Sequence, residues 1–82
     1  MPVATREEIA AEGQKVRRLQ MMMDLVMNVI RQNDAMPVEE ASELIASARH
    51  AALNLFPDKE LAYDLIYRPR FQRLLHEKYR IQ

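Results

Sequence analysis

The sequence predicts an all-α fold, a small bundle of three or four helices with a long N-terminal helix, forming one domain over residues 1–82. Three observations support this prediction. Hydrophobic residues make up 49% of the chain, which is too many for a disordered segment. Apolar residues recur at intervals of three and four rather than alternating, which favours helices over strands. One apolar run is wider than a single neighbouring helix can cover, so we expect homodimerisation to complete the bundle.

The first predicted helix covers residues 5–33. Thr5 and Glu8 fit a capping box at its start, in which the hydroxyl accepts a hydrogen bond from a first-turn amide and the carboxylate reaches back. The helix is expected to end near Asn33, which is followed by Asp34. At 1.5 Å per residue the helix is about 42 Å long, so it is the longest element of the domain.

The centre of this helix, residues 19–30, is almost entirely apolar. Only Gln20, Asp24 and Asn28 interrupt it, and their four-residue spacing puts them in one narrow polar stripe. A chain of this size buries only roughly 60% of its unfolded surface, and it has no cysteine for disulfides. Self-association is therefore the expected way to enlarge the core. The predicted association surface comprises Ile9, Val16, Leu19, Met22, Met23, Val26, Met27 and Ile30.

Three further helices are predicted, over residues 37–56, 58–67 and 69–80. Pro57 ends the first of these, because the residue before a proline avoids the helical region. Pro69 is predicted to break the chain again and to open the last helix. The apolar residues at helical spacing in these three segments are Ala41, Leu44, Ile45, Ala48, Ala52 and Leu55, then Leu61, Leu65 and Ile66, then Phe71, Leu74, Leu75 and Tyr79.

The two arginines Arg68 and Arg70 flank this proline and form a candidate site for an anion or a partner's carboxylate. If Pro69 opens a helix, the free amide of Arg70 points out of its N-terminus, where anions are favoured. The alternative is an internal ion pair, since Asp64 precedes Arg68 by four residues and the acidic second helix offers carboxylates to Arg70. The sequence favours the internal ion pairs.

A basic C-terminal segment gives the alternative function, a regulator that binds nucleic acid. Against it, the net charge of the chain is zero, and residues 34–66 are acidic enough to pair with the basic residues 67–82. No recognition-helix pattern is present. We therefore rank nucleic-acid binding below protein–protein association. The basic residues concerned are Arg68, Arg70, Arg73, Lys78 and Arg80, with Lys15, Arg17 and Arg18 as neighbours.

Catalysis, metal binding and cofactor binding have no support in the sequence. His50 and His76 each lack a second histidine or carboxylate at the spacing of a helical metal site. No secretion signal is evident at the N-terminus, and the apolar run is too short to span a bilayer, so we expect a soluble cytoplasmic protein.

The predicted function is a non-enzymatic helical interaction or regulatory module. It associates with itself, as a dimer, through the long N-terminal helix. The sequence leaves open whether the paired helices run parallel or antiparallel. A different protein docking on the methionine-rich surface, which includes Met21, or on the Arg68 and Arg70 site is the remaining alternative.

Overall fold

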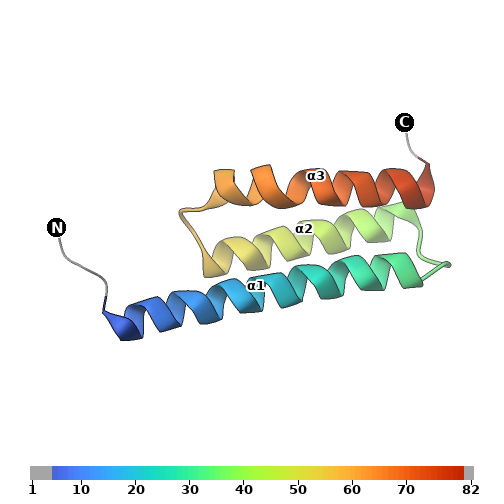
Figure 1. Ribbon diagram of the computed structural model, residues 1–82. Coiled ribbons are helices and arrows are strands. Elements are labelled where there is room, and N and C mark those ends of the chain that lie inside the picture. The colour runs from blue at the N-terminus through green and yellow to red at the C-terminus, as the bar shows by residue number, and fades with distance from the viewer. Residues whose placement is uncertain (1–4, 81–82) are drawn as a thin grey trace.

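A computed structural model describes residues 5–80 as an antiparallel arrangement of three helices joined by short loops (Figure 1). The molecule is elongated, with principal extents of 49 × 21 × 17 Å. The predicted all-α fold is confirmed for this part of the chain; residues 1–4 and 81–82 of the predicted domain lie outside it. The helices are α1 (Arg6–Gln32), α2 (Val38–Leu55) and α3 (Glu60–Tyr79).

Helix α1 begins and ends where the sequence predicts. The Thr5 hydroxyl accepts a hydrogen bond from the Glu8 amide at 3.1 Å, which satisfies one of the amides that a helix N-terminus leaves without a partner. At the other end the Asn33 amide donates to the Val29 carbonyl, and the Asn33 side chain accepts from the Ala35 amide at 3.2 Å. These contacts turn the chain sharply into α2.

Helix α2 packs against α1 through small side chains. Pro37 is its N-cap, and Pro57 follows closely after its end, so both prolines act as boundaries. Ala41, Ala48 and Ala52 are buried along one face of α2. α1 contacts α2 more extensively than it contacts α3.

Helix α3 runs straight through Pro69, so the predicted break there is wrong. A proline inside a helix removes the hydrogen bond to the carbonyl four residues earlier, here that of Leu65. Both Leu65 and Pro69 face solvent, where water can pair with that carbonyl. On the opposite face Tyr67 and Phe71 are buried on either side of the proline, and their packing holds both halves of α3 on the same core.

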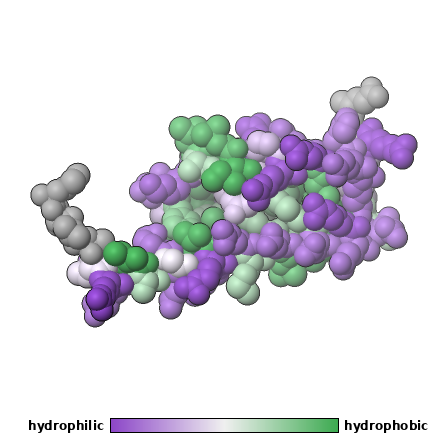
Figure 2. Space-filling model, in the orientation of Figure 1, coloured by the Kyte–Doolittle hydropathy of each residue, from purple (hydrophilic) through white to green (hydrophobic). Residues whose placement is uncertain are grey.

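The continuous helix changes which side of its N-terminal half faces inward. Tyr63, Tyr67 and Phe71 are all buried. They follow one another at four-residue spacing and therefore share one face of α3. Three further apolar side chains of this half lie off that buried face and are exposed, and Figure 2 shows hydrophobic residues gathered over this half of α3. They are Leu61, Leu65 and Ile66.

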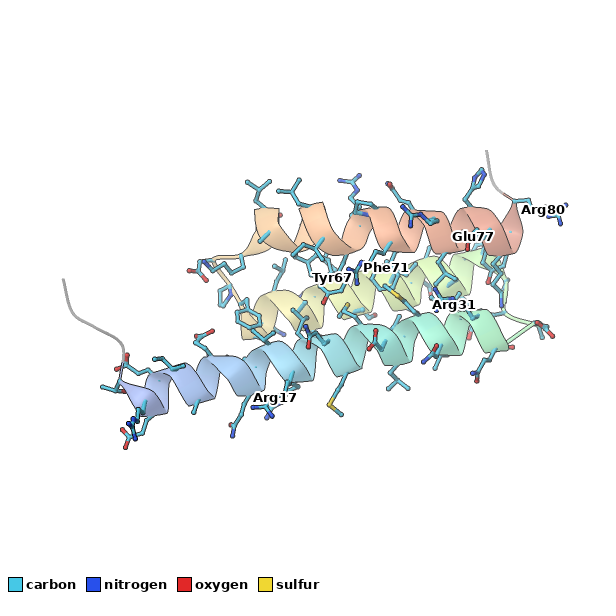
Figure 3. All side chains as sticks on the ribbon, in the orientation of Figure 1. Arg17, Arg31, Tyr67, Phe71, Glu77 and Arg80 are labelled. Atoms are coloured by element: carbon cyan, nitrogen blue, oxygen red, sulfur yellow. The ribbon has the colours of Figure 1, made fainter. Side chains whose placement is uncertain are left out.

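The core lies between the three helices and is entirely hydrophobic in the part of the chain that is described. Met23 and Ile30 of α1 are fully buried. Tyr67 and Phe71 point from α3 into the bundle, whereas Arg17 points away from it (Figure 3). The remaining buried residues are Met27, Met36, Ala41, Ala48, Ala52, Tyr63 and Leu74.

One end of the bundle is fastened by polar contacts, and we call it the closed end. Here the C-terminus of α3 lies against the loop between α1 and α2. The Lys78 ammonium donates to the carbonyls of Ile30 and Asn33, the latter at 2.6 Å. The Tyr79 hydroxyl donates to the Met36 carbonyl at 2.8 Å. A cation at the C-terminus of α1 also complements the helix dipole, so these contacts stabilise the whole corner.

A second polar contact joins α2 to α3. The Arg49 guanidinium donates to both carboxylate oxygens of Asp64, at 2.9 and 3.1 Å, and to Glu60 at 2.7 Å. Hydrogen bonding by Arg49 is the main reason that the pKa of the Asp64 carboxyl lies below its ordinary value. The sequence suggested Arg68 as the partner of Asp64, but Arg68 adds only a weaker charge interaction.

Candidate association surface

The predicted association surface is divided by the structure between the core and the exterior. Met23, Met27 and Ile30 are buried by α2 and α3 of the same chain, so they cannot serve as an intermolecular seam without unfolding. The heptad pattern identified an apolar face, and the central part of that face packs against α2 and α3 of the same chain. The other predicted members are Leu19, Met22 and Val26, which are half-buried, and Ile9 and Val16, which are exposed.

α1 carries a second apolar stripe, which the heptad pattern did not include in the predicted association surface. Met21, Leu25 and Val29 follow one another at four-residue spacing on the side of α1 away from the core. Met21 is 72% exposed and Leu25 is 63% exposed. The breadth of the apolar run was the signal for this stripe, because only three polar residues interrupt residues 19–30 and one bundle cannot cover the rest.

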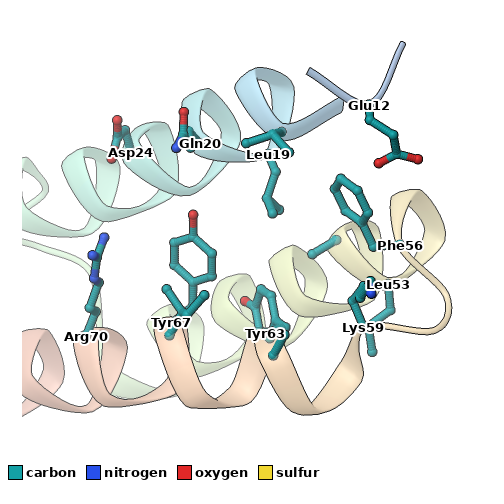
Figure 4. Close-up of a pocket in the computed structure, with 14 residues that line it drawn as sticks. Glu12, Leu19, Gln20, Asp24, Leu53, Phe56, Lys59, Tyr63, Tyr67 and Arg70 are labelled. Carbon is teal, nitrogen blue, oxygen red and sulfur yellow. The ribbon is translucent and has the colours of Figure 1, made fainter. Parts of the chain in front are cut away.

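Residues 12–24 of α1 also form one wall of a groove of about 610 Å³ (Figure 4). α3 forms the other wall and the end of α2 forms the floor. Apolar side chains line most of the groove, and Phe56 and Leu19 face each other near one end. The apolar lining residues are Val16, Leu19, Ala52, Leu53, Phe56, Ala62 and Ile66.

Two tyrosines of α3 stand in this groove. The Tyr63 hydroxyl donates to the Met23 sulfur at 3.6 Å, and burial raises the pKa of Tyr63 to about 12. The Tyr67 ring lies 5.3 Å from the Tyr63 ring, centroid to centroid. The Arg70 guanidinium carbon lies 5.6 Å from the centroid of the Tyr67 ring, within the range of a cation–π interaction. The α3 wall is therefore an ordered aromatic surface.

The edges of the groove carry opposite charges. Glu12 and Asp24 lie on the α1 wall, and Lys59 and Arg70 lie on the α3 wall. All four are exposed, and none of them takes part in the two ion pairs found within residues 5–80, which both involve Arg49. An apolar floor with a charged rim is the usual composition of a protein-docking surface.

The two arginines of the predicted anion site, Arg68 and Arg70, do not lie at a helix N-terminus. Pro69 lies inside α3, so the Arg70 amide is part of a continuous helix rather than at an exposed N-terminus. The two arginines also diverge: Arg70 lines the groove, whereas Arg68 lines a smaller hollow on the other side of α3 with Arg49.

The basic residues of the C-terminal segment are likewise spread around α3. Lys78 is engaged at the closed end, while Arg73 and Arg80 are exposed. His50 is exposed on α2. No group of three or more histidine, cysteine, aspartate or glutamate side chains suited to a metal ion occurs within residues 5–80.

Comparisons with protein-family models, with curated protein sequences and with solved structures give no match for this chain. No helix among the described residues combines the length and the apolar character that crossing a bilayer requires. The functional argument therefore rests on the surface itself.

Proposed function

We propose that this chain is a small non-enzymatic interaction module that self-associates through α1. The observation that carries the proposal is the distribution of exposed apolar side chains. Eight large hydrophobic residues are exposed in the described part of the chain, and five of them lie on α1. Those five are Ile9, Val16, Met21, Leu25 and Val29.

The concentration of these side chains on one helix supports association rather than chance exposure. Single exposed apolar residues are ordinary on protein surfaces, but contiguous patches mark interaction sites, and Met21, Leu25 and Val29 form one such stripe on α1. The groove adds a concave apolar surface beside the same helix, with Val16 exposed in its wall. Burying a valine or leucine side chain contributes about 1.5–3 kcal/mol, so covering several of them can offset the entropy lost on association.

Light scattering across a concentration series at moderate salt tests the proposal. The wild-type mass is expected to exceed that of the 9.6 kDa monomer and to rise toward a constant value. Two substitutions test the two exposed faces of α1 separately. Val16→Glu places a charge in the groove and Leu25→Glu places one on the outer stripe, and both positions are exposed, so folding should be preserved.

At least one of these two variants is expected to lower the mass to that of a monomer. Leu65→Glu is the control, because Leu65 is 69% exposed, close to the 63% of Leu25, but lies on the outer side of α3. A wild-type protein that stays monomeric at every concentration contradicts the proposal. So does an oligomer whose mass is unchanged in both α1 variants.

A further inference from the structure

The groove between α1 and α3 has edges that match each other in register. Figure 4 shows Glu12 and Lys59 at the end near Phe56, and Asp24 and Arg70 toward the opposite end. Along α1 the two carboxylates are separated by about 18 Å, and along α3 the two cations are separated by about 17 Å, at 1.5 Å per residue. Each end of the groove therefore offers one acidic edge position and one basic edge position at the same height.

This register makes the groove complementary to a second groove of the same kind. α1 and α3 run in the same direction (Figure 1), so a twofold axis parallel to the helices places α1 of one copy over α3 of the other without changing height. Glu12 then faces Lys59 of the second copy. Asp24 faces Arg70 of the second copy, and symmetry repeats both pairs.

The other symmetric arrangement is disfavoured by the same charges. A twofold axis across the helices places α1 over α1 in the antiparallel direction, which opposes Glu12 to Asp24 of the second copy. It likewise opposes Lys59 to Arg70. Like charges across an interface cost several kcal/mol, so the edges select between the two arrangements.

The apolar part of the groove fits the same arrangement. Val16 and Ile66 lie in opposite walls and are 42% and 50% exposed, and Phe56 is half-buried at one end of the groove. In the parallel arrangement Val16 of one copy lies over the wall that holds Ile66 of the other. The contact thus has an apolar centre and a charged rim.

We infer that the groove between α1 and α3 binds the same groove of a second copy of this chain, with the two α1 helices parallel. The inference rests on the proposed self-association and gives that association its surface and symmetry. It leaves the outer stripe of α1 outside the contact.

Charge reversal of one edge at a time tests the arrangement. E12K/D24K makes both edges of the groove basic, and K59E/R70E makes both edges acidic. Each variant alone is expected to raise the dissociation constant of the dimer at least about tenfold. An equimolar mixture of the two is expected to form a 1:1 complex, because every basic edge then faces an acidic edge.

Two further variants separate register from general charge effects. The fourfold reversal E12K/D24K/K59E/R70E exchanges the edges and is expected to self-associate like the wild type. E43K/E77K makes the same change in net charge as E12K/D24K at exposed positions that do not line the groove, and it is expected to leave the mass unchanged. Circular dichroism confirms that each variant is helical.

The outcomes distinguish this inference from the proposed function. Wild-type oligomers whose mass is insensitive to both edge reversals overturn the groove contact but leave self-association through α1 standing. Edge variants that dissociate but do not recombine on mixing overturn the parallel arrangement. A monomeric wild type overturns both proposals. Selective recombination of the two edge variants supports the inference.

Discussion

The closed end and the groove are built from the same three helices. They differ in how completely their side chains are buried or hydrogen-bonded within one chain. At the closed end Ile30 is fully buried, and Lys78 and Tyr79 donate hydrogen bonds to backbone carbonyls that a helix terminus and a loop leave available. At the groove Val16 and Ile66 remain exposed, and the charges around them face solvent.

The three helices also differ in length. α1 has 27 residues against 18 in α2 and 20 in α3, so its N-terminal turns extend beyond the other two helices (Figure 1). Only the first turns of α1 therefore lie beyond the ends of α2 and α3, whereas the groove lies where all three helices run side by side. The closed end is thus complete within one chain, whereas the groove keeps exposed apolar side chains, and we propose that these bind a partner.

The largest expected effect compares two methionines two residues apart on opposite faces of α1. Met23→Glu buries a carboxylate in the core, because Met23 has no exposed surface, and should cost about 4 kcal/mol or more of unfolding free energy. Met21→Glu puts the same group at a position that is 72% exposed and should change stability by less than about 0.5 kcal/mol. Urea titration of dilute protein measures both. Equal losses would place Met23 outside the core.

Pro69 offers the next largest effect, in the opposite direction. Pro69→Ala restores the backbone donor within α3 and removes a steric clash, so stability should rise by up to about 3 kcal/mol. Pro57→Ala is the comparison, because Pro57 lies in the loop and rigidifies the unfolded chain; it should lower stability by about 0.4–1 kcal/mol. Thermal unfolding followed by circular dichroism tests the pair. A loss on Pro69→Ala would mean that α3 uses the proline.

Removal of one amine distinguishes the closed end from the groove rim. Lys78→Met deletes the donor to the Ile30 and Asn33 carbonyls and should cost about 1–2 kcal/mol. Lys59→Met removes an exposed ammonium at the groove edge and should change the stability of the monomer by less than about 0.5 kcal/mol. Urea titration below the association concentration gives both values. If Lys59→Met is the more damaging, the closed end is not what fastens the bundle.

The smallest effect is a pH dependence from Tyr63. Its pKa is raised in the folded state to about 12, so the neutral hydroxyl stabilises the fold fully below pH 10. This stabilisation is lost as the pH rises from 10 through 12, and the loss should reach about 1 kcal/mol at pH 11. Tyr63→Phe lacks this loss, so the difference between the two proteins should shift over that range. Parallel stability curves from pH 9 to 11 would contradict the burial of this hydroxyl.

The fold was predictable wherever local signals and packing agree. The cap at Thr5, the alanine face of α2 and the stop near Pro57 each combine a backbone preference with an apolar pattern. The break predicted at Pro69 was wrong, because the local preference of proline for a helix start is outweighed by packing. Tyr67 and Phe71 are buried on the same face on either side of it. Propensity is a weak guide where tertiary packing opposes it.

The candidate site was less predictable for a different reason. The apolar breadth of α1 indicated an association surface, but the sequence does not show which part α2 and α3 cover. Met23 and Leu25 are equally apolar in sequence and differ completely in burial. The charged edges of the groove join Glu12 and Asp24 to Lys59 and Arg70, which lie far apart in the chain, so they became visible only once α1 and α3 were placed side by side.

Hydrogen–deuterium exchange at low and high protein concentration tests most directly whether the groove is completed by association while the closed end is complete in one chain. We expect amides lining the groove, around residues 12–20 and 62–70, to become more protected as concentration rises, because an interface there opposes local opening. Amides around residues 74–79 should gain less protection, because association protects them only by stabilising the fold as a whole. The same protection at every concentration, or a gain centred on the closed end, would contradict the account.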